Sequence, residues 1–550
     1  MWELVKPYWV SPERWMARGL LAVIIGMNLG EVYLNVLFND WNNAFYNSLQ
    51  AVDIKAFTAA LIRFSWLAAI FIVNGVYKMY LNQMLSIRWR RWLTGHYLHD
   101  WLGQQNYYRM QLLGQPTDNP DQRISEDINQ FISYTLDLSL GLLSAGVTLF
   151  SFLTILWNLS GPLAFDVGAM HVNIPGYMVW VALVYAVFGT WLTMVIGRPL
   201  VGLSFDQQKF EADFRFGLVR LRENSESIAF YQGEAREGEA FHARFGAIFA
   251  NYWQIMKRQK MLNWFTSGYQ QIAIIFPYVV AAPRFFAKQI QLGGLMQTAS
   301  AFGQVQGSLS YIVNSYVSLA GWRAVMTRLS GFNQSVRRAE AARVPAANFD
   351  RTHEGDKIIA ENLTVKLPDG AVLLKNIHLN VARGNSLLIT GPSGAGKSTL
   401  LRAIAGLWPF VEGKLVLPID LRMLFLPQKP YLPLGTLREV LCYPDAPSAN
   451  DAALVALLKT VQLDHLSDKL NAVDNWSHIL SLGEQQRIAI ARVLLARPDF
   501  VFLDEATSAL DESTEARLYP LLKQTLPRTA IISVGHRATL RAFHDAEMTL

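Results

Sequence analysis

The sequence predicts a multidomain protein in which a transmembrane domain of six α-helices is followed by an α/β domain. Of its 550 residues, 51% are hydrophobic and 17% are charged, whereas in soluble globular chains about a quarter are charged. Long apolar runs occur only in the first 340 residues, and alternating patterns typical of strands follow later. We therefore expect a transmembrane domain over 1–340, a polar linker over 341–355 and an α/β domain over 356–550.

The transmembrane prediction depends on six segments that reach the length of about 20 residues needed to cross a bilayer. The third and fourth are almost uninterrupted apolar runs, while the others contain Asn, Gln, Glu or Lys. Polar residues in a span indicate helices that face one another or an aqueous cavity. The expected spans are 17–38, 59–83, 136–159, 176–197, 263–283 and 295–322.

The distribution of charge predicts the orientation of these spans. The net charge of +6 arises before residue 341, with 27 Lys and Arg against 21 Asp and Glu, because the remaining residues contain 22 of each. Segments 84–135 and 198–262 contain five and ten basic residues, while loops 39–58, 160–175 and 284–294 contain one, none and two. Basic loops remain in the cytoplasm, so we expect both termini there. We expect no nucleic acid partner, since the basic residues lie beside apolar spans.

The first motif of the α/β domain follows an apolar strand, 386–390, and precedes a helical segment. Such a strand, loop and helix is the context in which the P-loop pattern is informative. Its glycines let backbone amides converge on the phosphates of ATP, Lys397 places a charge on the β and γ oxygens, and Ser398 ligates Mg²⁺. The expected ATP-binding residues are Gly391, Pro392, Ser393, Gly394, Ala395, Gly396, Lys397, Ser398 and Thr399.

A second motif is the apolar strand 500–503 followed by Asp504 and Glu505. With a P-loop about a hundred residues upstream, this pattern predicts that Asp504 holds Mg²⁺ and that Glu505 polarises the attacking water. Both ATP and Mg²⁺ are therefore expected cofactors of an ATPase.

Four further motifs occur around this strand, and the first of them distinguishes the chain from other P-loop ATPases. The run 480–487, LSLGEQQR, resembles the LSGGQ signature of ATP-binding cassette proteins. Gln428 resembles the glutamine of the cassette's Q-loop, residues 508–511 (SALD) its D-loop, and His536 its switch histidine. The resemblance implies catalytic roles for Glu505, His536 and Gln428, and a contribution of Gln428 to the Mg²⁺ site beside Ser398 and Asp504.

The resemblance also implies that the six-helix transmembrane domain is of the exporter type, that the α/β domain is a P-loop ATP-binding cassette, and that the working unit is a dimer. In that family, the signature of one cassette completes the γ-phosphate shell of the other, so that two ATP molecules lie between two cassettes. This chain contains one cassette and no internal repeat, so we expect a second copy of the chain as its partner. The signature residues expected to act in trans are Ser481, Leu482, Gly483, Glu484 and Gln485.

Variants within the motifs indicate a narrower group. The segments 406–409 (GLWP), 427–438 (PQKPYLPLGTLR) and 481–485 (SLGEQ), with 119–128 (NPDQRISEDI) in the membrane part, are similar to half-transporters of the peroxisomal acyl-CoA type and their bacterial SbmA/BacA-like and YddA-like relatives. The YddA-like branch fits best. One departure is Leu367, which occupies the place of the aromatic residue that stacks on adenine; loss of stacking predicts weaker adenine binding or a looser base preference.

The function expected from these observations is ATP-driven transport by a homodimer in a bacterial inner membrane. The relatives suggest an amphipathic substrate in the form of a fatty acid or acyl-CoA, a peptide, or cobalamin-like cargo. Membrane lipid and the transported substrate are further expected partners, and the direction of transport stays open.

An alternative of another class is a peptide permease driven by an ion gradient, with a regulatory ATPase domain. Its candidate carboxylates are Glu31, Asp137, Asp206 and Glu211. Under the simpler interpretation, Glu31 pairs with a neighbouring polar group and Asp137 caps a helix.

Overall fold

The computed structural model describes residues 2–113, 119–167, 170–342 and 349–550. The chain forms two compact units, one from Met1–Asp100 with Asp118–Asn333 and the other from Trp101–Thr117 with Gln334–Leu550. Residues 343–348 of the expected linker lie outside the described residues, as do 114–118 and 168–169 of the expected loops. The expected domain boundaries stay predictions.

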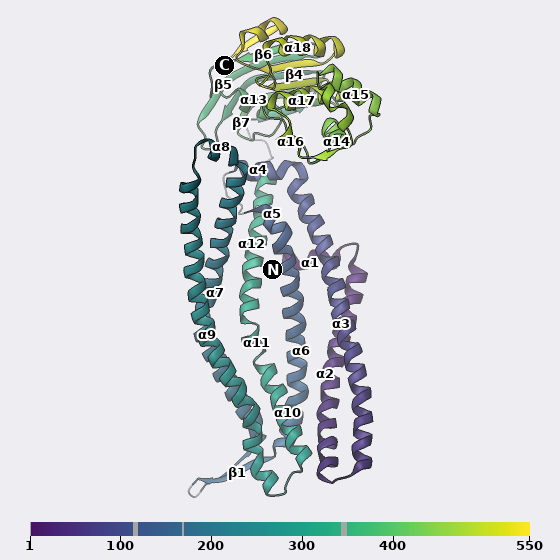
Figure 1. Ribbon diagram of the computed structural model, residues 1–550, viewed down its shortest axis with the longest axis vertical. Coiled ribbons are helices and arrows are strands. Elements are labelled where there is room, and N and C mark those ends of the chain that lie inside the picture. The colour runs from purple at the N-terminus through teal and green to yellow at the C-terminus, as the bar shows by residue number, and fades with distance from the viewer. Residues whose placement is uncertain (1, 114–118, 168–169, 343–348) are drawn as a thin grey trace. The chain divides into compact units, whose positions relative to one another are not determined.

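In its described residues, the first unit is helical apart from one antiparallel hairpin, β1 (Pro162–Val167) with β2 (Met170–Pro175) (Figure 1). A π-helical turn, Arg123–Asp127, connects α5 to α6, and the ends of α3 and α12 reach into the second unit. Short helices occur in both long basic segments. The helices are α1 (Trp2–Val10), α2 (Arg14–Gln50), α3 (Ile54–Leu102), α5 (Pro120–Gln122), α6 (Ile128–Ser160), α7 (Tyr177–Glu223), α8 (Ser225–Phe230), α9 (Glu234–Phe286), α10 (Leu292–Leu309), α11 (Tyr311–Asn314) and α12 (Tyr316–Ala341).

Membrane-spanning helices are present in this unit. In the described part of the chain, four helical segments are long and apolar enough to cross a membrane, and they contain the first four expected spans: Arg14–Gln50, Ile54–Leu112, Pro120–Ser160 and Tyr177–Glu223. The last two expected spans lie in α9 and across α10 to α12, which are not among these four. The number six therefore stays a prediction.

Polar side chains join the helices of this unit. The Asn28 amide donates to the Leu140 carbonyl at 3.0 Å, the Asn39 amide donates to the Gln297 carbonyl at 3.1 Å, and Lys78 pairs with Glu31. The expectation that polar residues of the early spans face neighbouring helices is confirmed. The simpler interpretation of Glu31 is confirmed too, whereas that of Asp137 is wrong, because Asp137 lies inside α6 and not at its end.

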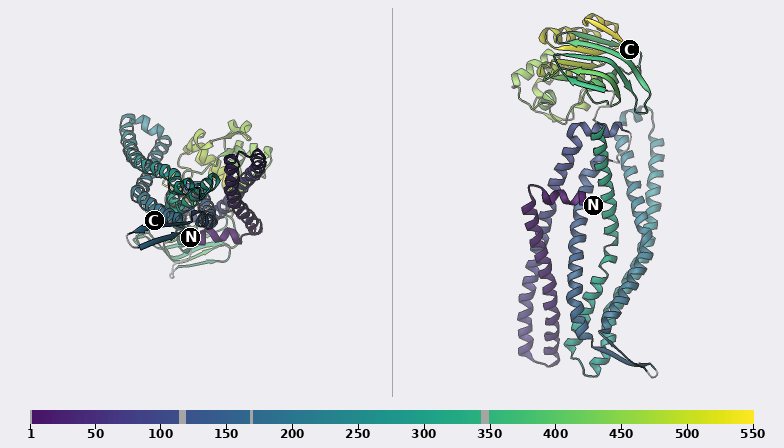
Figure 2. Two further views of the ribbon diagram at one scale, coloured as in Figure 1. Left: turned by 90° about the horizontal axis from the view of Figure 1, so that it is seen from below. Right: turned by 180° about the vertical axis from the view of Figure 1, so that it is seen from behind.

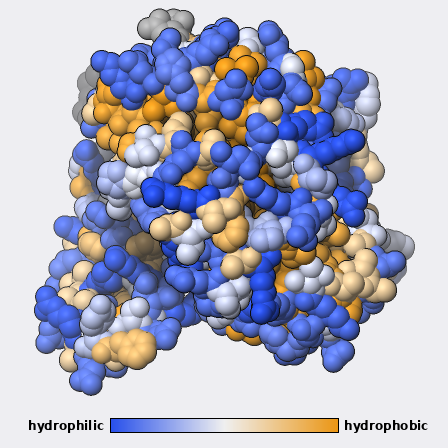
Figure 3. All heavy atoms as spheres, turned by 90° about the horizontal axis from the view of Figure 1, so that it is seen from above, coloured by the Kyte–Doolittle hydropathy of each residue, from blue (hydrophilic) through white to orange (hydrophobic). Residues whose placement is uncertain are grey.

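Apolar packing completes the bundle around α10. A buried cluster joins α6, α7 and α10 through side chains such as Phe152, Met178 and Phe302, and α7 and α9 run side by side (Figure 2). Many large apolar side chains are exposed on α3 and α7, among them Trp66 and Val184. Such exposure is typical of helices that face lipid. The face of the molecule in Figure 3 shows hydrophobic patches among mainly hydrophilic residues.

The second unit contains two larger sheets. The parallel sheet has the order β13-β6-β12-β11-β8, with β6 (Ser386–Thr390), β8 (Met423–Leu426), β11 (Phe500–Asp504), β12 (Ala530–Val534) and β13 (Ala546–Thr549). The second has the order β3-β7-β4-β5, with β3 (Phe349–His353), β4 (Lys357–Lys366), β5 (Val372–Ala382) and β7 (Val411–Leu417). Strand β3 falls inside the interval expected as linker. A two-stranded pair joins β9 (Gly435–Thr436) to β10 (Val473–Asp474).

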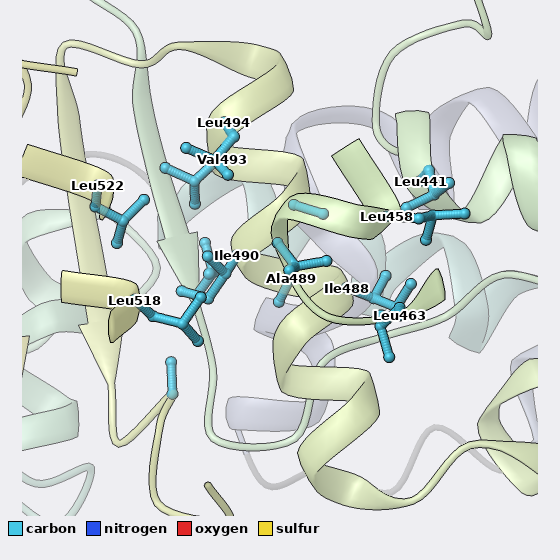
Figure 4. Packing of buried hydrophobic residues seen from close by; sticks show 14 of the residues in the cluster. Leu441, Leu458, Leu463, Ile488, Ala489, Ile490, Val493, Leu494, Leu518 and Leu522 are labelled. Atoms are coloured by element: carbon cyan, nitrogen blue, oxygen red, sulfur yellow. The ribbon is translucent and has the colours of Figure 1, made fainter. Parts of the chain in front are cut away.

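The helices of this unit pack into two apolar clusters, α13 with the sheet of β3, β7, β4 and β5, and α14, α15, α17 and α18 with one another and the parallel sheet. Helix α17 packs on two sides, and Figure 4 shows its Ile488 beside Leu463 and its Ile490 beside Leu518. Apolar residues around most of its circumference explain this burial, which holds the start of α17 in place. The helices are α4 (Asn106–Leu112), α13 (Lys397–Ile404), α14 (Leu437–Cys442), α15 (Asp451–Thr460), α16 (Trp476–Ile479), α17 (Leu482–Ala496) and α18 (Glu512–Thr525).

Candidate ATP site

The P-loop joins the end of β6 to the start of α13. Gly391, Gly394 and Gly396 have φ values of 144°, 83° and 93°, which residues with a Cβ rarely adopt. A Cβ on Gly391 would also lie 2.8 Å from the Leu550 carbonyl oxygen. These glycines therefore allow the tight loop in which backbone N–H groups converge at the N-terminus of a helix, a site suited to phosphate.

Lys397 lies at the first position of α13 and is buried. Its Nζ donates to the carbonyl oxygens of Gly391 at 2.9 Å and Pro392 at 2.8 Å. The side chain thus bends back over its own loop, and its charge lies near the backbone N–H groups of that loop.

Ser398 and Asp504 meet between α13 and the end of β11. The Ser398 hydroxyl donates to Asp504 Oδ1 at 2.8 Å. Burial raises the pKa of Asp504, the bond from Ser398 lowers it, and the charge of Glu505 raises it again, for a net increase. A hydroxyl and a carboxylate oxygen at one point are the hard ligands that Mg²⁺ prefers, so these two residues fit the expected metal.

Glu505 and His536 form the next part of the site. Strands β11 and β12 are parallel, with Asp504 opposite Val534, so the residues that follow them emerge at one edge of the sheet. His536 Nε2 lies 3.1 Å from Glu505 Oε1. Glu505 has φ of 50°, a strained conformation for a residue with a side chain, and strain of this kind is concentrated at functional sites.

Gln428 is connected to the site through its backbone. The buried amide of Gln486 donates to the Gln428 carbonyl at 2.9 Å and to Ser508 Oγ at 3.3 Å, and it accepts from the Ala509 amide at 3.0 Å. The Gln428 side chain is exposed, and within the described ranges no hydrogen bond joins it to Ser398 or Asp504. Its expected place at Mg²⁺ stays a prediction.

The predicted signature forms the start of α17. Ser481 caps the helix, and its hydroxyl accepts from the Glu484 amide while the Glu484 carboxylate accepts from the Ser481 amide at 2.9 Å. Burial alone would raise the pKa of Glu484, but the bonds from Ser481 and the charges of His465 and Arg487 give a net decrease. The Gln485 side chain donates to the Leu480 carbonyl at 2.8 Å.

The signature and the P-loop are not in contact within the chain. Among the residues that the structure describes, no hydrogen bond or ion pair joins 481–485 to 391–399. The remaining signature residues, Leu482 and Gly483, lie in the first turn of α17, where Leu482 is exposed and a Cβ on Gly483 would be 3.1 Å from the Ala509 carbonyl oxygen. The role of the start of α17 at the nucleotide of a second chain therefore stays a prediction.

Sequence reasoning missed two residues of this region, Gln486 and Arg537. Arg537 Nη1 donates to the Leu510 carbonyl at 2.9 Å and Nη2 donates to the Ser508 carbonyl at 3.0 Å. Both side chains therefore hold the segment 508–511. The only sequence signals were their positions, Gln486 directly after the signature and Arg537 directly after His536.

Leu367 lies in the turn between β4 and β5. Its amide donates to the Ala371 carbonyl at 2.8 Å, and its half-buried side chain packs against the core of the sheet. The weaker adenine binding expected from this residue stays a prediction.

Comparisons with known proteins agree with this architecture. The family "ABC transporter transmembrane region 2" matches residues 4–286, and the family "ABC transporter" matches residues 374–508. An ABC transporter ATP-binding protein of Haemophilus influenzae is 38% identical, with 99% of this chain and 92% of that protein covered. The inner membrane ABC transporter ATP-binding protein YddA of Escherichia coli is 36% identical, with 97% and 94% covered.

The fold itself has a solved counterpart, a bacterial Atm1-family ABC exporter with ATP bound. It is 18% identical, with a TM-score of 0.75 and with 97% of this chain and 93% of that chain covered. The exporter-type fold expected from the sequence is thereby confirmed, as is the resemblance to YddA-like proteins. With both family regions present and full-length relatives above 30% identity, the chain belongs to the ABC transporter family, whose ATPase domain is coupled to transport.

Proposed function

We propose that this chain is a half-transporter that functions as a homodimer and uses ATP hydrolysis to move an amphipathic substrate across a bacterial inner membrane. Both termini are cytoplasmic in this arrangement, as the basic loops require. The observation that carries the proposal is the separation of the P-loop from the signature in one chain. Two chains combine the two halves into complete ATP sites.

The residues of one chain divide the work at each site. The P-loop amides and Lys397 bind the phosphates, and Ser398 and Asp504 hold Mg²⁺, with Gln428 as a further ligand. When bound, Mg²⁺ neutralises charge on the β and γ phosphates. Glu505 orients and polarises the attacking water, and His536, 3.1 Å from Glu505, contacts the γ-phosphate.

The partner subunit supplies the remaining contacts. The first turn of α17 presents Ser481 and the amide of Gly483 to the nucleotide of the other chain. ATP thus joins the two cassettes, and hydrolysis with phosphate release separates them. Transport follows as an alternation between two states whose populations depend on nucleotide.

An apolar cavity in the first unit supports the proposal of an amphipathic substrate. It has a volume of about 650 Å³ and lies between α7 and the α10 to α12 segment. Its walls include Val187, Trp191, Met194 and Leu309, while Arg198 is its only charged lining residue among those described. An apolar wall with one cation fits a chain with an acidic end group, which favours a fatty acid or an acyl-CoA over a peptide or a cobalamin-like molecule.

The test is ATPase stimulation of the purified protein in lipid, with separate panels of fatty acids and acyl-CoA, cationic peptides and cobalamin. We expect the first panel to stimulate ATPase activity. The concentration that gives half-maximal stimulation should rise about tenfold or more in Arg198→Gln, because a charged hydrogen bond is lost. Arg220→Gln, an exposed residue of α7 outside the cavity, should respond like the wild type. Stimulation by another panel alone contradicts the substrate class and leaves ATP-driven transport intact.

The permease driven by an ion gradient has one observation in its favour. Asp137 lines two polar cavities, of about 220 and 400 Å³, together with Asn82. Glu31 is already paired with Lys78, and Glu211 with the Gln207 amide at 2.9 Å. Asp206 is exposed and lines neither cavity, so Asp137 is the principal candidate for this route. Transport that persists in Glu505→Gln but stops in Asp137→Asn or without a proton gradient would favour it over the half-transporter.

A further inference from the structure

The second unit contains a cavity that the ATP site does not use. It has a volume of about 510 Å³ and lies between α4, the strands β3 and β7, and the end of α13. This volume is in the range of small-molecule sites. The P-loop precedes the first residue of α13 while the cavity borders its last residues, so the two sites are at opposite ends of this helix.

Helix α4 forms one wall and is firmly attached to this unit. Its Asn106, Arg109 and Met110 are all at most 5% exposed, and Leu112 packs against the core of the sheet. The Arg109 guanidinium donates to the carbonyl of Gln104, and it lies 3.5 Å from the Gly406 carbonyl oxygen. One cation of the cavity is therefore held in a fixed position.

A second guanidinium, that of Arg351 on β3, faces the same cavity. Its Nε is buried and has no hydrogen-bond partner. A Cβ on Gly406, where φ is 76°, would be 2.1 Å from Arg351 Nη1, so the glycine leaves the space that the guanidinium occupies. Burial lowers the pKa of Arg351, and the charge of Arg109 lowers it further.

The charges around the cavity are unbalanced. Its described lining contains Arg109, Arg351 and His353 but no Asp or Glu. A buried N–H group without a partner is costly, and two neighbouring guanidinium groups repel each other. Both costs disappear when an anion with several acceptor oxygens lies between them. Guanidinium groups match phosphate in a bidentate geometry.

We propose that this cavity is a binding site for a phosphate-bearing anion, separate from the ATP site and formed by Arg109, Arg351 and His353. The bound phosphate bridges α4 and β3 beside the end of α13. Because α4 lies in the segment between two predicted spans, the anion stabilises the attachment of this segment to the cassette and regulates the ATPase. Its source is either a soluble phosphorylated molecule or the headgroup of an anionic phospholipid.

The test uses the full-length protein, first saturated with Mg²⁺ and a non-hydrolysable ATP analogue so that the P-loop is occupied. Inorganic pyrophosphate is then titrated by calorimetry. We expect one additional site, with an affinity about ten- to a hundredfold lower in Arg351→Gln, as for loss of a charged hydrogen-bond pair. Arg351→Lys keeps the charge but loses the bidentate geometry of the guanidinium, so its affinity should be intermediate. Arg517→Gln, an exposed arginine of α18, should bind like the wild type.

Thermal unfolding distinguishes a ligand site from a structural role. If the two arginines only stabilise the fold, Arg351→Gln lowers the unfolding temperature of the ligand-free protein, and pyrophosphate changes neither protein. We expect the reverse. The unfolding temperature of ligand-free Arg351→Gln should be at least as high as that of the wild type, and pyrophosphate should raise the unfolding temperature of the wild type but not that of Arg351→Gln. Absence of an additional pyrophosphate site, or equal binding by wild type and Arg351→Gln, overturns the proposal.

A second arm identifies the source. The pyrophosphate titration is repeated in nanodiscs of phosphatidylcholine with or without phosphatidic acid. Lower apparent affinity in the presence of phosphatidic acid, in the wild type and in the control Arg517→Gln alike, assigns the site to a lipid headgroup. Equal affinity in both nanodiscs assigns it to a soluble phosphate compound. Both results require that pyrophosphate binds to the cavity of the wild type, so both support the proposed site.

Discussion

Two helices of the second unit begin at the proposed sites for phosphate, but the two ends differ in what the chain itself provides. The start of α13 has a glycine loop, a lysine folded over it and the Ser398–Asp504 pair within 2.8 Å. The start of α17 has a serine cap and its reciprocal glutamate. The first end contains the groups proposed to bind and react, whereas the second is a capped helix terminus. This difference is what the proposed homodimer requires, in which α17 completes a site whose chemistry the other chain supplies.

The largest expected effect tests whether the α13 end carries the chemistry. In Glu505→Gln the group that polarises water is lost, so we expect ATP turnover to fall about 10²- to 10⁴-fold, while ATP binding is retained. Turnover and equilibrium nucleotide binding are both measured in lipid. The matched control is Glu361→Gln, an exposed carboxylate on β4 that pairs with Lys414 at 3.4 Å. Wild-type turnover in Glu505→Gln would contradict the assigned role.

The second test asks whether the α17 end acts on the same chain or on the partner. Lys397→Ala disables the P-loop and Ser481→Arg blocks the signature, both placed in chains that also carry Glu505→Gln so that ATP is retained. One mixed dimer has the two changes in different chains, and the other has both changes in one chain. If the signature acts in trans, only the first dimer contains an intact site.

We therefore expect the first mixed dimer to retain about one ATP and the second to lose retention roughly 10²-fold, as for removal of preorganised phosphate contacts. Retained nucleotide is counted after gel filtration of affinity-tagged dimers. Thermal unfolding of each chain verifies that Ser481→Arg, which also alters a helix cap, leaves the fold intact. Retention by the second dimer alone would show a signature that acts in cis.

Both helix ends were accessible from the sequence, because each depends on a local pattern. The P-loop and the pair Asp504 and Glu505 are contiguous patterns whose geometry is local, since a strand, a loop and a helix fix it. The capping box is local too, because Ser481 and Glu484 are three residues apart. The fold class followed for the same reason, from apolar runs and alternating strands.

What the sequence did not reveal depends on contacts between distant segments. Gln486 reaches Gln428 and Ser508, 58 and 22 residues away, and Arg537 reaches Leu510. Nothing in a single sequence pairs these residues. Strand β3 was hidden by a polar, Pro-containing neighbourhood, because its pairing with β7 comes from residues more than 60 positions later. The cavity at Arg351 could not be predicted for the same reason, because its walls come from segments that are distant in the sequence.

The smallest expected effect concerns the base of the nucleotide, which neither helix end contacts. Leu367 contributes an apolar surface without a π-face, so Leu367→Tyr should restore stacking and raise ATP affinity about two- to tenfold. The side chain is half-buried at a turn, so a ring can extend outward without displacing the core. Affinities for ATP and GTP are compared, with Ile419→Tyr, an exposed apolar position between β7 and β8, as the control. A higher ATP affinity with unchanged turnover per bound nucleotide would show that recognition of the base is separable from both helix ends. Unchanged ATP affinity would mean that Leu367 does not occupy the adenine position.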